Sequence, residues 1–166
     1  TITVDYATAN GSATASADYL PASGTVTFNP GDTSKSVTVT TQTDTLDEDD
    51  ETFATNLSNP SNATITDAQG VGTIADDDAA PTISINDVTV NPEGDSGTKS
   101  AEFTVSLSAP SEKTITVDYA TADGTATVVN HYAQATGTVT FSPGDTSEPV
   151  TVTTQTDTTD EDDETF

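Results

Sequence analysis

The stretch GTVTFNPGDTSKSVTVTT, residues 24–41, alternates apolar and polar residues on both sides of a turn. Val26 and Phe28 precede the turn signal PGDTS, and Val37 and Val39 follow it. Apolar residues at every second position are typical of a strand that buries one face, whereas Pro, Gly and Asp are typical of turns. The stretch therefore predicts two short β-strands separated by a turn.

The same period of two extends along the rest of the chain. Threonine, which is abundant throughout, is β-branched and suits the solvent-facing side of a pleated sheet. No segment shows the periodicity of an amphipathic helix. The sequence therefore predicts an all-β protein. The alternation is clearest at Ile2, Val4, Tyr6, Phe103, Val105 and Leu107.

The composition, taken alone, favours a disordered chain. The 28 Asp and Glu residues face only three basic residues, which leaves a formal net charge of -25. Leu, Ile, Val and Phe together make up less than a fifth of the chain, as in many disordered proteins. The regular placement of the apolar residues argues for a fold instead. Such a fold needs something that relieves the repulsion between its carboxylates.

An internal repeat sets the domain organisation. Residues 1–53 and 114–166 align without a gap, and 40 of the 53 aligned positions are identical. Residues 54–78 and 82–113 each occur once. The repeat unit is thus roughly a hundred residues long, the size of one sandwich domain. In this piece of a longer array we expect residues 1–78 to be a domain without its first strands, 79–81 a linker, and 82–166 a domain without its last strands.

One complete repeat contains seven strand patterns separated by turn signals such as ADGT and SPGDTS. Short strands with a turn every ten or so residues are typical of an antiparallel β-sandwich. The immunoglobulin variant built around a disulfide and a buried Trp is excluded, because the chain has neither Cys nor Trp. We expect strands near residues 82–90, 101–107, 114–120, 138–141, 149–154, 52–57 and 71–75.

Several classes of function conflict with this composition. An acidic surface repels phosphate backbones, so nucleic acid is not an expected partner. No apolar run approaches the length of a membrane span, and no signal peptide is visible. With one imidazole, no Trp and few aromatic residues, neither a Ser/His/Asp arrangement nor a sugar-binding platform is expected. We therefore predict that the protein is not an enzyme.

The acidic run, residues 44–51 (DTLDEDDE), places six carboxylates in eight positions, and it recurs at residues 157–164. Each copy falls in a loop, at the sandwich end where Asp76–Asp78 follow the last strand and Glu93 begins the next domain. Ca²⁺ takes about six to eight oxygen ligands in irregular geometry, whereas Mg²⁺ demands a small octahedral shell. The run therefore predicts a Ca²⁺ site. A solvated acidic loop that binds nothing is the alternative.

Two familiar calcium-binding loops do not fit the run. An EF-hand needs Asp or Asn as oxygen ligands at loop positions three and five and Gly at position six, where this sequence has Leu46, Glu48 and Asp49. The nonapeptide repeat of β-helix proteins is absent as well. The prediction is therefore calcium held by the loops of a sandwich domain.

Three stretches together resemble the Calx-beta domain. They are VDYATANGSATASADYLPASGTVTFNPGDTSKSVTVTTQTDTLDEDDETF (4–53), GTIADDD (72–78) and ISINDVTVNPEGDSGTKSAEFTVSLS (83–108). The family occurs in the regulatory loop of sodium/calcium exchangers, in an integrin and in tandem arrays of surface proteins. The resemblance implies a seven-stranded immunoglobulin-like antiparallel β-sandwich that binds several Ca²⁺ ions in the loops at one end.

The resemblance also implies a set of ligands, carried over motif by motif. Leu46 and Thr159 would contribute backbone carbonyls and the other residues carboxylates. The first copy lacks an opening glutamate and the second lacks terminal aspartates. The implied ligands are Asp18, Asp44, Leu46, Glu48, Glu51, Asp76, Asp77 and Asp78 in the first copy, and Glu93, Asp157, Thr159, Glu161 and Glu164 in the second.

The two copies differ most at residues 15–21, which read ASADYLP against VVNHYAQ at residues 128–134. Asp18 is thereby replaced by His131. A neutral imidazole is a poor Ca²⁺ ligand, so the second site is expected to bind more weakly. Two interpretations of His131 stay open, an exposed loop residue and a ligand of a transition metal.

We expect Ca²⁺ at the domain ends to rigidify an array of Calx-beta repeats in an extracellular or cell-surface protein. The module would serve as a spacer in adhesion or cell communication, with Ca²⁺, neighbouring repeats and cell-surface or matrix molecules as partners. Two alternatives stay open: a regulatory calcium sensor, as in the exchangers, and a protein- or glycan-binding module of a secreted enzyme. Ca²⁺ affinity separates the spacer from the sensor.

Overall fold

The computed structural model describes residues 1–92, 94–158 and 162–166. The chain divides into two compact units, Thr1–Asp78 (unit 1) and Ala79–Phe166 (unit 2), and each is described by itself. The described residues form strands, turns and coil, and no helix. In the same part of the chain, no helix is therefore long and apolar enough to cross a membrane.

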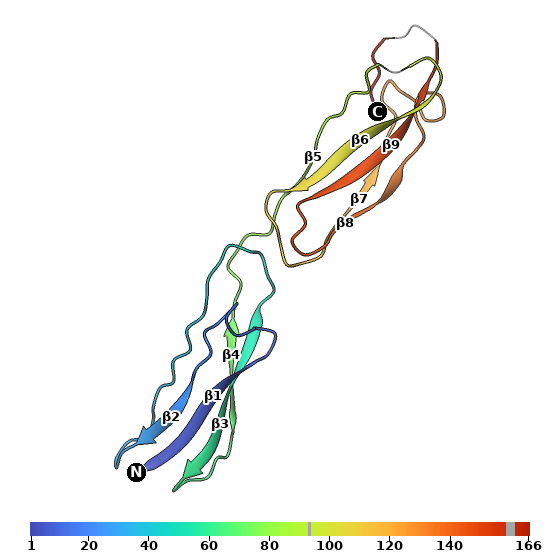
Figure 1. Ribbon diagram of the computed structural model, residues 1–166. Helices are drawn as coiled ribbons and strands as arrows, with labels where there is room; N and C mark the ends of the chain where they lie inside the picture. The colour runs from blue at the N-terminus through green and yellow to red at the C-terminus, as the bar shows by residue number, and fades with distance from the viewer. Residues whose placement is uncertain (93, 159–161) are drawn as a thin grey trace. The chain divides into compact units, whose positions relative to one another are not determined.

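Unit 1 contains one antiparallel sheet of four strands (Figure 1). The order across the sheet is β2-β1-β3-β4, so β1 is paired along both of its edges. Ile2 lies opposite Phe28 and Val4 opposite Val26, which brings the alternating apolar residues of β1 and β2 onto a shared face. The strands are β1 (Ile2–Asn10), β2 (Ser23–Phe28), β3 (Glu51–Ser61) and β4 (Gln69–Ile74).

Unit 2 contains two antiparallel sheets, one of order β5-β6-β9 and one formed by β7 and β8 (Figure 1). The long pairing of β6 with β9 runs from Gly97, opposite Thr156, to Ser106, opposite Ser147. The strands are β5 (Ile83–Ile85), β6 (Gly97–Leu107), β7 (Ile115–Ala120), β8 (Thr136–Phe141) and β9 (Ser147–Thr156).

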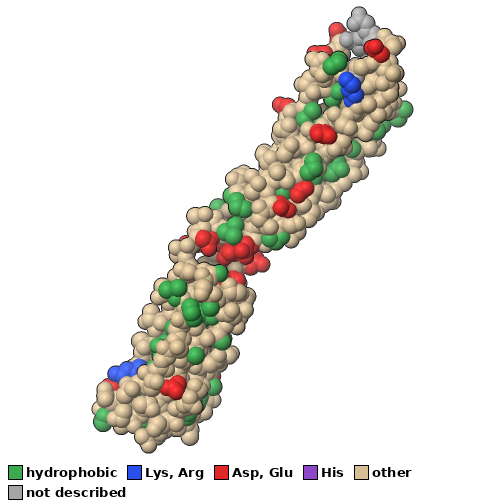
Figure 2. Space-filling model, in the orientation of Figure 1, with side chains coloured by type: hydrophobic (Ala, Val, Ile, Leu, Met, Phe, Trp, Pro, Cys, Tyr) green, Lys and Arg blue, Asp and Glu red, His purple; other side chains and the backbone are tan. Residues whose placement is uncertain are grey.

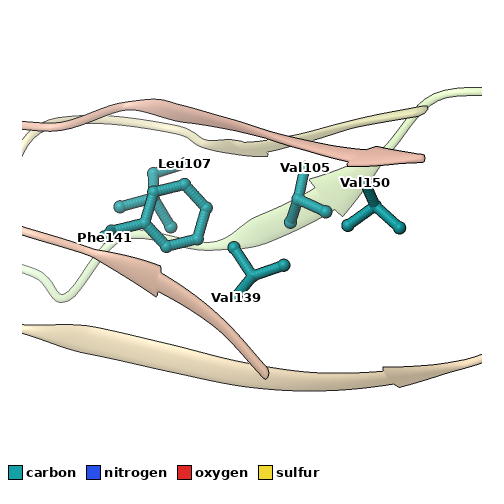
Figure 3. Close-up of a cluster of buried hydrophobic side chains, with 5 residues drawn as sticks. All are labelled: Val105, Leu107, Val139, Phe141 and Val150. Carbon is teal, nitrogen blue, oxygen red and sulfur yellow. The ribbon is translucent and has the colours of Figure 1, made fainter. Parts of the chain in front are cut away.

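The core of unit 2 lies between these two sheets (Figure 3). Val105 and Leu107 of β6 and Val150 of β9 contact Val139 and Phe141 of β8, and Phe141 is fully buried. On β6 and on β8 the two buried residues are two positions apart. The apolar residues that alternate in the sequence are therefore the ones that face the core. The prediction of an all-β fold of antiparallel sheets is confirmed.

The strands of a repeat are found where the sequence predicts them, with one shortened. The strand expected at 82–90 ends at Ile85. The side chain of Asn86 explains the end, because its Oδ1 accepts the amide of Thr104 at 2.6 Å and so takes the place of a ladder carbonyl. Val88 and Val90 still pack against the core without being part of a strand.

Residues 34–43 form no strand, so the prediction of a second strand in the opening stretch is wrong. The copy of this segment in unit 2 does form a strand, β9. In unit 2, β9 pairs with β6. Residues 82–113, which contain β6, occur once in the chain, so residues 34–43 have no second copy of β6 to pair with. Val39 nevertheless packs against the cluster of Ala13, Tyr19 and Phe53. Alternating apolar residues thus indicate which side of a segment is buried. Formation of a strand also requires a neighbouring strand with which the segment can pair.

Candidate metal centre

The Asp18 turn, residues 14–19, is anchored by a buried tyrosine. Tyr19 is 1% exposed and stacks on Phe53 at the start of β3, with ring centroids 4.7 Å apart. Its hydroxyl donates a hydrogen bond of 2.7 Å to Oδ1 of Asn10, the last residue of β1. The turn is therefore fixed to the ends of two neighbouring strands of the sheet.

Asp18 closes this turn with its own carboxylate. Its Oδ2 accepts the amide of Thr14 at 2.6 Å and the hydroxyl of the same residue at 3.0 Å. The backbone amide of Asp18 donates in return to the carbonyl of Thr14 at 3.0 Å. Both side-chain bonds fall on one oxygen, so Oδ1 keeps its lone pairs for another partner.

The start of β3 is held beside the turn by the backbone. The amide of Ala13 donates to the carbonyl of Thr52 at 3.0 Å, and the amide of Thr52 donates to Oγ of Ser12 at 2.9 Å. Gly11 permits this approach, because a Cβ at that position would overlap the carbonyl oxygen of Thr52. As a result Glu51, the first residue of β3, lies next to the Asp18 turn.

Three carboxylates converge at this point. One oxygen from each of Asp18, Glu48 and Glu51 lies within 4.8 Å of the other two. Two ligands on opposite sides of a Ca²⁺ ion are about 5 Å apart, because each Ca–O bond is about 2.3–2.6 Å long. The three side chains are thus spaced so that a single Ca²⁺ ion could touch all of them.

The rest of the acidic run is tied to the segment that follows β4. The amide of Leu46 donates to Oδ1 of Asp44 at 2.8 Å, which closes a turn inside the run. The amide of Asp76 donates to Oδ1 of Asp50 at 3.0 Å. The amide of Asp78 donates to Oδ1 of Asp76 at 3.3 Å. Segments far apart in the sequence therefore bring their carboxylates to one end of unit 1.

These segments surround an open depression of about 390 Å³. A water molecule takes up roughly 30 Å³ in the liquid, so the depression has room for cations together with their remaining waters. Acidic side chains gather densely at this end of unit 1, where β3 begins and β4 ends (Figure 2). The described residues that line it include no Lys, Arg or His, but do include Asp18, Asp44, Leu46, Glu48, Glu51, Asp76, Asp77 and Asp78.

The electrostatics of the depression are those of crowded anions. The pKa of Asp78 is raised above its ordinary value of 3.8, first by burial and then by the neighbouring charges of Asp77, Asp76, Asp44 and Asp47. Each of these effects disfavours the charged form of the carboxyl group. A divalent cation would reverse the second effect, because it replaces repulsion between the carboxylates with attraction to a shared ion.

Two residues of the run take part although the motif did not single them out. Asp47 is only 4% exposed and lies near enough to Asp78 to raise the pKa of that residue, and Asp49 lines the depression. In a loop no periodicity tells which side chains point inward, so the sequence alone could not separate them from their neighbours. The high density of carboxylates was the only available signal.

The second copy is described only in part. Glu93, Thr159 and Glu161 lie outside the described residues, whereas Asp157 is exposed and the side chain of Glu164 is 29% exposed. Nδ1 of His131 lies 3.1 Å from Oε2 of Glu164, and the side chain of His131 is 26% exposed. His131 is therefore a half-buried residue in contact with a predicted ligand, which corrects the interpretation of a merely exposed loop residue.

All eight ligands predicted for the first copy thus line one depression, and three of them approach within the span of one ion. In the second copy the structure places Glu164 against His131. That these residues hold a metal remains a prediction. The donor set, which consists of carboxylates and backbone carbonyls, is of the kind that hard divalent cations prefer.

Comparison with known proteins gives relatives along the whole chain. Rat (Rattus norvegicus) sodium/calcium exchanger 2 is 32% identical over 173 residues, which cover 92% of this chain and 18% of the exchanger. Dog (Canis lupus familiaris) sodium/calcium exchanger 1 is 44% identical over 59 residues, covering 36% of this chain and 6% of that protein. The chain therefore spans less than a fifth of the length of these curated relatives.

Among solved structures, CBD12 from CALX1.2 matches with a TM-score of 0.45 and 26% identity, covering 92% of this chain and 63% of that one. The calcium binding domain CBD12 of CALX1.1 matches with a TM-score of 0.46 and 24% identity, covering 90% and 61%. The family model of the Calx-beta domain matches residues 1–78 and again residues 76–166. The chain therefore belongs to the Calx-beta domain family, in two consecutive copies.

Proposed function

We propose that this protein is a calcium-binding regulatory module, in which Ca²⁺ occupies the depression at the end of unit 1. The observation that carries the proposal is the convergence of Asp18, Glu48 and Glu51 within 4.8 Å of one another. Membership of the Calx-beta family and similarity to exchangers named for sodium and calcium support the choice of ion. They also favour regulation over the purely structural role.

The proposed mechanism is relief of repulsion. Without the ion, the carboxylates raise one another's free energy. Their repulsion is the second cause, after burial, of the raised pKa of Asp78. Bound Ca²⁺ joins the acidic run to Asp76, Asp77 and Asp78, which are the last residues of unit 1. Ion occupancy thereby changes the freedom of the segment that leads into unit 2. A neighbouring domain would respond to Ca²⁺ through that segment.

A spacer in an extracellular or cell-surface array is the second candidate. It is favoured by the near identity of the two repeats and by the presence of only three Lys and Arg residues. In that setting Ca²⁺ would stay bound and keep successive domains rigid. Sensors work with a Kd of ~10⁻⁷ to 10⁻⁵ M, and extracellular modules with ~10⁻⁴ to 10⁻³ M. The measured Kd therefore decides between the two roles.

The test is a calorimetric titration of the whole chain with Ca²⁺ at fixed ionic strength, with Mg²⁺ as the ion control. Wild type should bind Ca²⁺ well above the Mg²⁺ background. Glu51→Gln should weaken binding by at least the roughly ten- to hundredfold typical of losing even an outer-shell partner of a metal. Glu102→Gln, which makes the same change on an exposed strand position, is the matched control. Equal heats with both ions would contradict the proposal.

A further inference from the structure

The turn that carries Asp18 is rebuilt in unit 2 almost bond for bond. Tyr132 is fully buried, stacks on Phe166 with centroids 4.6 Å apart, and donates to Oδ1 of Asp123 at 2.7 Å. The amide of Ala126 donates to the carbonyl of Thr165 at 3.0 Å. These contacts reproduce those of Tyr19, Phe53 and Asn10 in unit 1. The position of residue 131 is therefore the position of residue 18.

At this position the two side chains close the turn in the same way. The amide of Thr127 donates to Nδ1 of His131 at 2.9 Å, as the amide of Thr14 donates to Asp18. The backbone bond is also kept, since the amide of His131 donates to the carbonyl of Thr127 at 3.0 Å. The replacement thus preserves the turn.

What the replacement does not preserve is a donor atom for a metal. A carboxylate has two oxygens, and Asp18 uses Oδ2 alone for the turn. An imidazole ring that accepts the Thr127 amide at Nδ1 carries its proton on Nε2, so neither nitrogen has a lone pair left for a cation. The same nitrogen lies 3.1 Å from Oε2 of Glu164, so the ring lies directly against that carboxylate.

We propose that residue 18 and its counterpart 131 determine how many cations each copy holds: Asp18 contributes a ligand, whereas His131 contributes none and lies with its ring against Glu164. This inference rests on the proposed function of unit 1 and extends it to a difference between the copies. Unit 1 is then the unit that responds more strongly to Ca²⁺. Unit 2 keeps the same turn but binds fewer Ca²⁺ ions.

The experiment exchanges the two residues in the full chain and counts bound Ca²⁺ by equilibrium dialysis. His131→Asp should add at least one ion per chain, and Asp18→His should remove at least one. Asn130→Asp, which adds the same charge to the same turn one residue earlier, is the matched control and should add none. The amide signals of Thr127 and Thr14 show whether each turn is still closed.

His131 is the only histidine, so its ring signals are unambiguous in NMR spectra. A Zn²⁺ titration of the wild-type chain should leave them in place, and a saturable shift would make the ring a metal ligand and overturn the inference. Wild type that binds Ca²⁺ while His131→Asp gains nothing over Asn130→Asp would overturn the inference alone. Wild type that binds no Ca²⁺ would overturn the proposed function, and the inference with it.

Discussion

Residue 16 and its repeat counterpart 129 share an unusual backbone conformation. Ser16 has φ of 79° and Val129 has φ of 80°, although neither is Gly. The left-handed region is costly for side chains with a Cβ and most costly for β-branched ones. Because the conformation recurs in both copies, it belongs to the turn and not to either sequence. Val129 is also 78% exposed, so its side chain gains little packing in return.

Val129→Asn should stabilise unit 2 by about 1 kcal/mol, because Asn tolerates a positive φ that Val does not. Ser16→Asn is the matched substitution in unit 1 and should change stability less, since Ser is not β-branched. Chemical denaturation followed by NMR checks this. Amide signals from residues 54–78 report on unit 1 and those from residues 82–113 on unit 2. Equal effects of the two substitutions would show that the backbone conformation carries no strain at Val129.

Asp78 should make unit 1 less stable at neutral pH than in acid when Ca²⁺ is chelated. Its pKa is raised in the folded state, so its favourable contribution is complete below the unfolded value near 3.8 and is lost as pH rises through the folded pKa. Asp78→Asn should therefore raise the unfolding temperature in chelator at pH 7 and flatten its pH dependence. The same substitution should weaken Ca²⁺ binding.

The comparison of Asp78→Asn with wild type separates the effect of Asp78 from that of carboxyl groups whose pKa is shifted in the opposite direction. Asp5 has a lowered pKa, because the hydroxyl of Thr25 and then the amide of Asn59 donate to it. Its contribution is present above its unfolded value and is lost in acid. If Asp78→Asn lowered the unfolding temperature in chelator, the charged form of Asp78 would not be disfavoured in the folded state, either by burial or by the neighbouring carboxylates.

Single residues show how far the site could be predicted. The acidic run stands out by charge, so its place in a loop between strands follows from sequence. The inward position of Asp47 does not follow, because a loop has no period that separates its inner side from its outer side. The hydrogen bond from the amide of Thr127 to Nδ1 of His131 could not be predicted from the sequence either, since it depends on how the turn closes.

At the scale of elements, the two copies place identical strands in different surroundings. Phe141 of β8 is fully buried by β6 and β9, whereas Phe28, at the same position of β2, is only partly buried. Phe141→Ala should therefore cost about 3–5 kcal/mol, as for other buried aromatic residues. Phe28→Ala should cost clearly less. The denaturation experiment with unit-specific NMR signals measures both values.

Equal costs for the two Phe→Ala variants would mean that Phe28 of β2 is buried in solution to the same extent as Phe141 of β8.

Partner strands are also the reason why the fold could be predicted only in part. Alternation in the sequence reports which side of a segment is buried, and this held for Val39 as well as for Val152. Whether the segment joins a sheet depends on a distant partner, and residues 34–43 lack the one that β9 finds in β6.

At the scale of the whole molecule, a net charge of -25 is combined with few large apolar residues. Such a chain has little stability in reserve, so the ionic conditions should decide how firmly it folds. Added Ca²⁺ stabilises the form that binds it by about 2.7 kcal/mol per site at a hundredfold excess over Kd.

We therefore expect removal of Ca²⁺ by a chelator to lower the unfolding temperature of unit 1 by several degrees and that of unit 2 by less. Raising the NaCl concentration in chelator should restore part of the loss, because salt screens repulsion between exposed carboxylates. Calorimetry gives the temperatures, and the unit-specific amide signals assign them. An equal loss in both units would show that the two copies respond to calcium alike.

The bonds that hold the Asp18 turn against the sheet are made largely by main-chain atoms and by the tyrosine that follows it, whereas the side chain at position 18 or 131 closes the turn itself. Ala13 with Thr52 in one copy and Ala126 with Thr165 in the other need no particular side chain at position 18 or 131. After duplication, that position could change without unfolding its surroundings, provided that the new side chain still accepts the amide of Thr14 or Thr127, as Asp18 and His131 do. In an array of such repeats, single substitutions at this position can therefore change how each unit binds Ca²⁺. The fold of every unit is kept while the calcium response of the array is varied.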